Sequence, residues 1–402
     1  MKNFDFVVIG GGIVGMTVAR ELAARKAGRI ALFEKEDEFG CHASGRNSGV
    51  LHSGIYYSAE SIKARVCAAG SRRMQQYAVE KGIPLRKCGK VVVAPSAELL
   101  PQLDVLMGRA AANGIKLEKI DEKQLAELEP LAARGHGVAL FSPTTAVIDT
   151  KAVLRSLAED LAVAGVEVVR SVKAVGASGA QKILRTTKAD YGFGHLVNCA
   201  GLHADRVAHW FGAGKKYRIL PFKGVYKKLV PETAARLRGA IYPTPDLRVP
   251  FLGVHLTRTV DGEVIVGPTA IPAFGRENYG LLSGIDLAEC PGITRDLLGM
   301  LVRDTGGFRT LVREEFGRYY FPNFLRAARA LVPSLGRGDF RSCKKVGLRA
   351  QLFNIEKGAL EMDFVIEAGP ASTHVLNAVS PAFTASFEFA GWVAGKALGT
   401  AA

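Results

Sequence analysis

The chain has 402 residues, 48% of them apolar and 23% charged, and its 53 basic and 38 acidic side chains give a formal charge of +15. This length suffices for two domains with a large core, and no apolar run reaches the roughly 18–20 residues that a membrane-spanning helix needs. The basic residues form no tract interleaved with aromatics, which argues against a nucleic-acid-binding protein. A basic surface can attract acidic substrates or contact an anionic membrane, with an ordinary solvated surface as the alternative.

The N-terminus and the cysteines indicate a cytoplasmic protein. The first apolar run, residues 6–9, leads straight into glycines and is too short for a secretory signal. The cysteines form no CxxC pair, which argues against a disulfide framework or a zinc site and predicts inert thiols, a reducing cytosol and no bound metal. They are Cys41, Cys67, Cys88, Cys199, Cys290 and Cys343. The basic charge leaves room for peripheral contact with the inner membrane.

The first predicted elements form a βαβ unit. Residues 4–9 are an apolar run with β-branched side chains, which is typical of a buried parallel strand. A glycine turn follows at 10–15, helical spacing extends over 13–25, and a second strand is predicted at 29–34. This order is that of a Rossmann nucleotide-binding unit.

The later elements are of two kinds. Strands are predicted at 90–94, 166–169, 195–199 and 375–379, and helices at 97–113, 150–165, 296–300, 324–331 and 381–398. Residues 222–230 and 241–266 have strand character interrupted by Pro243, Pro245 and Pro250, which favours an antiparallel sheet. We therefore predict an α/β protein with two domains interleaved along the chain.

The glycine turn predicts a dinucleotide site. Gly10, Gly12 and Gly15 form G-x-G-x-x-G, in which the glycines permit the tight turn, the approach of a pyrophosphate, and close packing of helix on strand. The helix N-terminus offers free N–H groups to the phosphates. Glu34 lies 19 residues after Gly15, where a carboxylate accepts hydrogen bonds from ribose hydroxyls. A chance glycine turn is the alternative.

The segment at 40–57 separates FAD from NAD. It is a loop of small and hydroxyl-bearing residues soon after Glu34. Such a loop suits a backbone that passes close to a second ring system and its phosphates. This favours FAD, with an NAD-dependent dehydrogenase as the weaker alternative.

Several sequence blocks carry a family resemblance over nearly the whole chain. They are GGGIVG at 10–15, NSGVLHSGIYY at 47–57, CGKVVVA at 88–94, NCAGLHADR at 198–206, PFKGVY at 221–226, YPTPDLRVPFLGVHLTR at 242–258, VGPTAI at 266–271, GLRAQ at 347–351 and NAVSPAFTAS at 377–386. In these blocks the chain resembles the D-amino-acid-oxidase-like superfamily of FAD enzymes. Within it, the chain is most similar to the L-2-hydroxyglutarate dehydrogenase/oxidase family.

The resemblance implies a fold and a cofactor site. The fold is a GR2-type Rossmann FAD-binding domain at 1–87, 142–215 and 341–402, with an interleaved antiparallel-sheet substrate domain at 88–141 and 216–340. The implied cofactor-binding residues are Gly10, Gly12, Ile13, Val14, Gly15, Glu34 and Lys35 at the ADP half, Ser44, Arg46, Asn47, Ser48 and Gly49 along the pyrophosphate and isoalloxazine, and Val172, Ala200, Gly201, Ser380, Pro381, Ala382 and Thr384. The Val172 backbone would pair with adenine, and the helix that begins near Ser380 would point at the flavin N1–C2=O edge. For Val172 and this helix, plain core packing is the alternative.

The flavin is expected to bind without a covalent bond. Related enzymes often attach it through a histidine near the position of Asn47. An asparagine side chain is unable to form that bond.

The substrate site is expected around Arg349. Residues 347–349 resemble the G-x-R segment that carries the carboxylate-binding arginine of the superfamily, and a guanidinium grips a carboxylate with two parallel hydrogen bonds. A structural ion pair is the alternative role. Oxidation of a hydroxyl also needs a general base, for which His52 is favoured over His255. Either histidine could instead be purely structural.

A second carboxylate on the substrate would need another cation. Candidates are Arg46, Lys223 and Arg258, with Tyr57 and Tyr226, and also Tyr56, as hydrogen-bond donors or as core residues. The chain departs from the family pattern at Arg46, Val225, Thr269 and Lys345, where histidine, glutamate, asparagine and a Pro-Ala pair are usual. These departures bear on the identity of the substrate.

The resemblance implies an FAD-dependent dehydrogenase or oxidase that converts an L-2-hydroxy acid, such as the dicarboxylate L-2-hydroxyglutarate, into the 2-oxo acid. Hydride transfer to flavin N5 would be followed by reoxidation with oxygen or a membrane quinone. An amino-acid or amine oxidase on the same scaffold is one alternative. A non-catalytic flavoprotein subunit is another.

Overall fold

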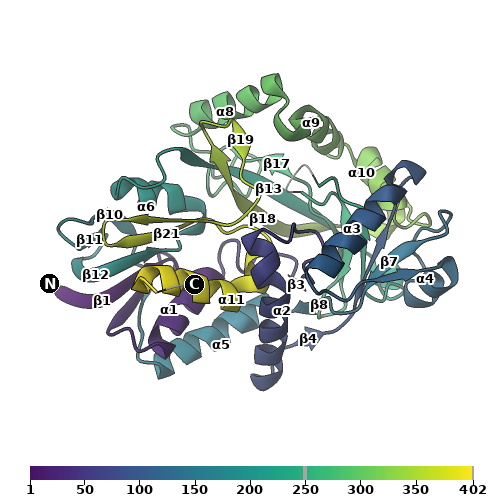
Figure 1. Cartoon of the computed structure of the whole chain (residues 1–402). Helices are drawn as coiled ribbons and strands as arrows, with labels where there is room; N and C mark the ends of the chain where they lie inside the picture. Colours follow the sequence, from purple (N-terminus) through teal and green to yellow (C-terminus); the bar gives the residue numbers. More distant parts are fainter. Residues whose placement is uncertain (248–250, 401–402) are drawn as a thin grey trace.

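The computed structural model describes residues 1–247 and 251–400 and places them around two large sheets (Figure 1). The first sheet has a parallel centre in the order β9, β2, β1, β12, β21, with the β10–β11 hairpin and β20 added in antiparallel fashion. Its strands are β1 Lys2–Ile9, β2 Ile30–Phe33, β9 Glu167–Val169, β10 Ala174–Ser178, β11 Ile183–Thr186, β12 Asp190–Asn198, β20 Val365–Gly369 and β21 Ser372–Asn377. The predicted Rossmann unit is therefore present.

The first sheet is apolar on both faces because helices cover both. Along β1, Phe6 and Val8 pack against helices α1 (Ile13–Ala24), α5 (Thr150–Val163) and α11 (Ala382–Leu398). Val7 and Ile9 pack toward α6 (Ala204–Trp210). Figure 1 shows α1, α5 and α11 side by side under this sheet. Burial on both faces explains why β1 has a continuous apolar run.

The second sheet joins strands from across the chain. They are β5 Lys90–Val93, β6 Glu118–Ile120, β7 Ala139–Ser142, β13 Tyr217–Leu229, β14 Ala240–Pro243, β15 His255–Arg258, β16 Val264–Gly267, β17 Ile271–Pro272, β18 Phe340–Asn354 and β19 Ala359–Leu360. Its pairs are antiparallel except for β5 with β14, which are parallel. Pro250, one of the predicted strand breaks, lies outside the described residues. A small third sheet contains β3 Val50–Leu51, β4 Leu85–Arg86 and β8 Ala146–Ile148.

Helices cover both faces of the second sheet. Leu103 and Leu106 of α3 pack on the face that carries Val92, whereas α4 and α10 pack on the face that carries Val91 and Val93. The α-helices of the chain are α1 Ile13–Ala24, α2 Ile62–Glu80, α3 Leu100–Ala112, α4 Glu122–Leu128, α5 Thr150–Val163, α6 Ala204–Trp210, α7 Pro231–Ala234, α8 Cys290–Arg303, α9 Phe308–Gly317, α10 Phe321–Arg329 and α11 Ala382–Leu398. Short 3₁₀ turns lie at η1 Ala97–Leu99, η2 Gly201–His203, η3 Thr305–Gly307 and η4 Arg337–Asp339.

Two features differ from the expected elements. Helix α2 is capped by Ser61 and packs on α11, and it is absent from the predicted elements because its sequence is mixed and polar. Strand β18 pairs with β13 along its length, although the predicted division assigns 341–402 to the FAD-binding domain. The domain boundaries remain a prediction, and β18 is the strand whose pairing departs from them.

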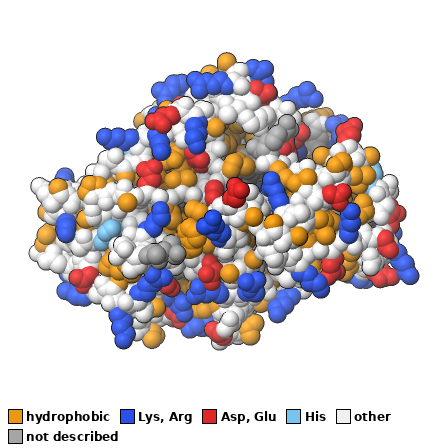
Figure 2. Space-filling model, in the orientation of Figure 1, with side chains coloured by type: hydrophobic (Ala, Val, Ile, Leu, Met, Phe, Trp, Pro, Cys, Tyr) orange, Lys and Arg blue, Asp and Glu red, His pale blue; other side chains and the backbone are white. Residues whose placement is uncertain are grey.

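The surface and the helices bear on membrane contact. On the face shown in Figure 2, Lys and Arg side chains are scattered among acidic and apolar ones. In the described part of the chain, every helix is too short or too polar to cross a bilayer.

Candidate active site

A cavity of about 580 Å³ extends from the glycine turn after β1 to the second sheet. Most of the predicted site residues line it, although they come from segments far apart in the sequence. These residues are Gly10, Gly12, Ile13, Val14, Glu34, Lys35, Ser44, Arg46, Asn47, Ser48, His52, Val172, Ala200, Gly201, Tyr226, His255, Arg349, Ser380, Pro381, Ala382 and Thr384.

Two predicted glycines lie behind the cavity wall. A side chain at Gly15 would overlap the Gly10 carbonyl oxygen, so Gly15 permits the close packing of α1 on β1 that the motif predicts. Gly49 has φ +74°, and a Cβ there would lie 2.6 Å from the Ile148 carbonyl oxygen. Both glycines shape the backbone of the site without lining it.

Three predicted substrate residues, Tyr57, Lys223 and Arg258, are not among the side chains that line the cavity. The Lys223 ammonium donates to the Gly280 carbonyl at 2.5 Å, and the Arg258 guanidinium donates to the Leu237 carbonyl at 2.5 Å. Burial raises the pKa of Tyr57, whose ring packs in the core around α3. The expected substrate contacts of Tyr57, Lys223 and Arg258 are therefore wrong, because these side chains do not line the cavity.

The glycine-turn end of the cavity fits a dinucleotide. Gly10 has φ +106°, and a Cβ there would collide with the Cys199 carbonyl. Helix α1 begins after Gly12 with no side-chain cap, so its N-terminus is open to a phosphate. The Glu34 carboxylate accepts the Gly11 N–H at 2.8 Å and the Glu36 N–H at 2.9 Å. These bonds hold Glu34 beside the turn, where a ribose would lie.

The loop after Glu34 is held against this turn. The Ser44 hydroxyl accepts the Ile13 N–H at 2.9 Å. The Asn47 amide donates to the Ser44 carbonyl at 2.8 Å and accepts the Gly49 N–H at 2.9 Å. Asn47 therefore organises the loop beside the cavity.

Only one of the two backbone groups of Val172 is available for the predicted contact with adenine. The Val172 N–H donates to the Glu34 carbonyl at 3.0 Å. Val172 lines the cavity, so its carbonyl is the group left for adenine.

The opposite end of the cavity presents an unpaired arginine. Arg349 donates no hydrogen bond to any described residue, and its Nη1 is buried without a partner. Its guanidinium lies over the Phe251 ring, 5.0 Å from the centroid. Burial lowers the pKa of Arg349, which Tyr226 and Glu315 partly offset. A buried guanidinium without a partner favours an anionic ligand.

Two histidines line this same end. His52 is half-buried, and its Nδ1 has no hydrogen-bond partner. The His255 ring stacks on Tyr242 with centroids 3.9 Å apart, and its Nδ1 lies 3.0 Å from the Gly253 carbonyl oxygen. Burial lowers the pKa of both histidines to about 3, with further lowering from Lys90 in each case. Both rings are therefore neutral near pH 7 and able to accept a proton.

Sequence reasoning missed two residues on this wall, Tyr242 and Gln351. Gln351 donates to the Glu361 carbonyl at 2.7 Å and leaves its own carbonyl oxygen without a partner. It follows Arg349 by two positions on β18, so strand alternation places both side chains on one face. That spacing could have identified Gln351 from the sequence.

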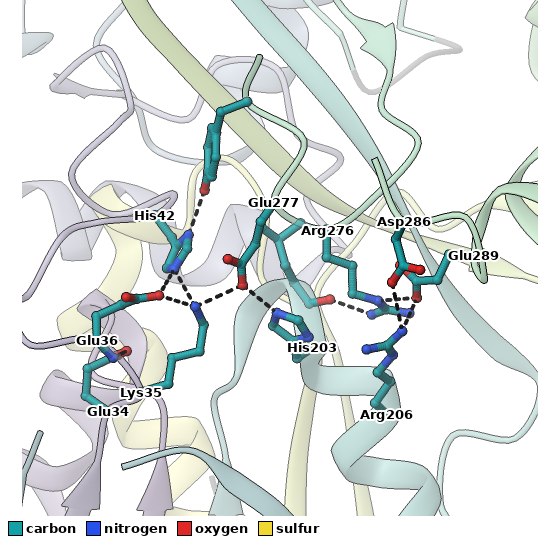
Figure 3. A network of polar contacts seen from close by, with 12 residues as sticks. Glu34, Lys35, Glu36, His42, His203, Arg206, Arg276, Glu277, Asp286 and Glu289 are labelled. Carbon is teal, nitrogen blue, oxygen red and sulfur yellow. Dashed lines mark hydrogen bonds and ion pairs between the residues drawn. The ribbon is translucent and has the colours of Figure 1, made fainter. Parts of the chain in front are cut away.

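A segment at 273–289, which we call the strap, contributes Glu277 to the cavity wall. Figure 3 shows Arg276, Glu277 and Glu289 of the strap in contact with residues of other segments. Glu277 pairs with Lys35 at 2.9 Å and with His203 at 3.2 Å. The Tyr279 hydroxyl lies 2.7 Å from His42 Nδ1. The strap therefore contacts Lys35 and His42 in the segment that follows Glu34.

Further bonds anchor the strap and its contacts. The Arg276 guanidinium pairs with Asp205, and with Glu289 at 2.6 Å. Glu36, His42 and Glu277 bring three potential ligand atoms within 4.8 Å of one another, and the Lys35 ammonium contacts both carboxylates. No single residue pattern in the sequence pointed to these contacts.

Comparison with solved structures shows the fold. The chain superimposes on an L-α-glycerophosphate oxidase from Mycoplasma pneumoniae with FAD bound, with a TM-score of 0.78 and 20% identity over 99% of this chain and 95% of that one. A glycine oxidase from Geobacillus kaustophilus gives 0.74 and 18% identity over 100% and 96%. The expected fold, a Rossmann FAD-binding domain with a substrate domain, is thus confirmed.

Sequence comparison extends this to the family. The chain is 35% identical to an L-2-hydroxyglutarate dehydrogenase of Escherichia coli, over 98% of this chain and 93% of that protein. It is 34% identical to the human mitochondrial L-2-hydroxyglutarate dehydrogenase, over 98% and 88%. The family model for FAD dependent oxidoreductases (DAO) matches residues 5–395. The chain therefore belongs to the DAO family of FAD-dependent oxidoreductases, and its cofactor is FAD.

Proposed function

We propose that this enzyme oxidises L-2-hydroxyglutarate, an L-2-hydroxy dicarboxylate, to 2-oxoglutarate. The observation that carries the proposal is the unpaired Arg349 guanidinium on the cavity wall, with the neutral His52 and His255 at the same end. An unpaired buried guanidinium suits a carboxylate, and a neutral imidazole suits a hydroxyl proton. The names of the relatives support the same substrate.

The proposed reaction assigns binding and proton transfer to the chain. Arg349 holds the carboxylate next to the reacting carbon and fixes its orientation. His52 takes the hydroxyl proton as the carbonyl forms, and FAD held at the glycine turn would supply the hydride acceptor for that carbon. The substrate thus loses two electrons and two hydrogens, one as hydride and one as a proton on the imidazole.

His52 is the better candidate for the base. It is half-buried and open to the cavity, with an unpartnered ring nitrogen. His255 is only 7% exposed, stacks on Tyr242 and has Nδ1 near the Gly253 carbonyl. We therefore assign abstraction of the substrate hydroxyl proton to His52. His255 packs on Tyr242 and shapes the cavity wall.

The first turn of α11 lines the same cavity through Ala382 and Thr384. No side chain caps this helix. Its positive end favours negative charge on a group placed before it, such as the edge of a reduced flavin. The Thr384 hydroxyl also accepts the His52 backbone N–H at 3.2 Å, which fixes the base relative to the helix.

The acceptor and the location complete the proposal. Electrons would pass from the flavin to oxygen or to a membrane quinone. The protein would work in the cytoplasm, and its basic surface would allow peripheral contact with the inner membrane.

Anaerobic mixing of the holoenzyme with matched 2-hydroxy and 2-amino acids tests the function. We expect L-2-hydroxyglutarate to bleach the visible flavin band faster than L-2-hydroxyvalerate or L-glutamate, because only the first has both the hydroxyl and two carboxylates. Faster bleaching by the amino acids would favour an amino-acid oxidase. No bleaching with any compound would point to a non-catalytic flavoprotein.

The strap yields a prediction about cofactor retention. Replacing Glu277 with glutamine removes the charge that pairs with His203 and Lys35, and we expect FAD to be released about threefold faster, a modest effect because the pair is partly exposed. Release is measured as the rise of flavin fluorescence after dilution. Glu314→Gln is the control, since Glu314 pairs with Arg318 outside the strap.

The pH dependence of the strap has a defined sign. The hydrogen bond with His203, followed by that with Lys35, holds the pKa of Glu277 well below its usual range. The stabilisation is therefore present above the ordinary carboxyl pKa and is lost as the pH falls toward the lowered value. An equal release rate in Glu277→Gln and in the unaltered protein at pH 7 would contradict this role.

A further inference from the structure

Lys90 is a charged residue buried among apolar and aromatic side chains. Strand alternation on β5 places Lys90 on the same face as Val92, which packs in the core around Tyr56 and Tyr242. Lys90 is 1% exposed, and its Nζ has no hydrogen-bond partner. The ammonium lies 4.4 Å from the centroid of the Tyr56 ring and 5.0 Å from that of Tyr242. A buried lysine without an acceptor is costly and needs a reason.

Lys90 lies directly behind the substrate end of the cavity. Tyr242 lines the cavity and its ring stacks on His255. The same ring also contacts the Lys90 ammonium. The charge of Lys90 also contributes to the low pKa of His52 and His255. Its electric field therefore reaches the cavity wall through one aromatic ring.

Among the described residues, the cations Arg349 and Lys90 at this end have no ion-pair partner of opposite charge. Arg349 and Lys90 both have unpartnered nitrogens. Glu315, the carboxylate that acts on Arg349, is already paired with Arg318 and accepts the Ala270 N–H at 2.5 Å. On Lys90 itself, the one group of opposite tendency in the described residues is the Cys67 thiol. A ligand with negative charge would balance these cations.

We propose that Lys90 is a specificity-determining residue that makes this site prefer a substrate with two negative charges over one with a single charge. The inference rests on the proposed function, in which Arg349 holds the first carboxylate. Lys90 then acts on the second carboxylate at a distance, across the Tyr242 ring, without touching the substrate. Such attraction is strong because a buried charge is poorly screened.

A binding experiment with redox-inert ligands tests the proposal. Glutarate carries two carboxylates and butyrate carries one, and both perturb the visible flavin spectrum of the holoenzyme when they bind near it. We expect the unaltered enzyme to prefer glutarate and Lys90→Met to reduce that preference about tenfold, a size typical of one charge acting at low screening. Lys63→Met is the control. Lys63 is also a buried lysine, 5% exposed, but it donates to the Met362 carbonyl at 2.5 Å.

The outcomes separate the two proposals. If the unaltered enzyme shows no preference for glutarate, the dicarboxylate function fails and the role of Lys90 fails with it. If the unaltered enzyme prefers glutarate and Lys90→Met keeps the full preference, only the role of Lys90 is overturned. An equal loss in Lys63→Met would also overturn it, since any buried lysine would then give the effect.

A second measurement uses the unaltered holoenzyme and does not depend on folding of the variant. Burial lowers the pKa of Lys90 to about 7, and a bound anion should raise it again. At pH 8 in weak buffer, glutarate binding should therefore take up a fraction of a proton, and Lys90→Met should not show this uptake. Both histidines have a pKa of about 3, too low to account for uptake at this pH. Binding of glutarate without proton uptake would overturn the proposal.

Discussion

Replacing Arg349 with methionine should lower kcat/KM for the hydroxy acid about a thousandfold, since loss of a buried charge partner costs roughly 3–5 kcal/mol. The guanidinium is the unpaired cation on the wall of the cavity and makes no hydrogen bond to a described residue. The Arg349 guanidinium therefore stabilises the bound ligand more than it stabilises the fold. Arg349→Lys should recover part of the loss, because it keeps the charge but lacks the two-pronged geometry.

Stopped-flow flavin reduction over a range of substrate concentrations measures this effect. Arg341→Met is a matched control, since Arg341 is exposed near the start of the same strand, β18. The control should keep its kcat/KM and its thermal stability. If Arg349→Met retained kcat/KM within a few-fold, the carboxylate would have to be bound elsewhere.

The second large effect on the rate of flavin reduction is expected from replacing the proposed general base, His52. His52→Gln should slow flavin reduction at saturating substrate about a thousandfold, within the 10²–10⁴ typical of a lost general base. Glutamine keeps the approximate size and a hydrogen-bonding end but takes up no proton. His255→Gln should cost less than about tenfold, because its ring acts through packing on Tyr242.

The pH profile gives an independent check of the base. Because burial holds the pKa of His52 and His255 at about 3, the base stays neutral through the mildly acidic range. The kcat/KM profile should therefore lack a fall centred near the ordinary histidine pKa. A larger loss in His255→Gln than in His52→Gln would move the base to His255.

Local sequence patterns accounted for the cofactor end of the site. The strand, the G-x-G-x-x-G turn, the helix and Glu34 follow one another within a short stretch of chain, and the structure forms β1, α1 and β2 at these places. Gly15 packs on Gly10 as the motif requires. Short-range patterns are reliable here because each glycine has one local steric reason.

At the substrate end of the cavity, whether a predicted residue meets the substrate depends on the face of the strand that its side chain occupies. Arg349 is paired with Phe222 across the β13–β18 ladder, and Lys223 with Leu348. Cross-strand partners share a face, so Lys223 points to the face opposite Arg349. Alternation likewise places Arg258 on the face opposite His255 within β15. The sequence could show that His255 and Arg258 divide between two faces of one strand, whereas the division of Lys223 and Arg349 depends on the register of β13 with β18.

The sequence by itself thus determined the cofactor class, and most of the site residues it predicted line the cavity, because these depend on residue type and local spacing. Tertiary structure decided which cations face the substrate and that β18 pairs with β13. It also decided that the strap contacts Lys35 and His42. His42 and Tyr279 are 237 positions apart, and Lys90 reaches the site only through Tyr242. Contacts of that kind arise from strand register and packing between distant segments, for which a single chain carries no local signal.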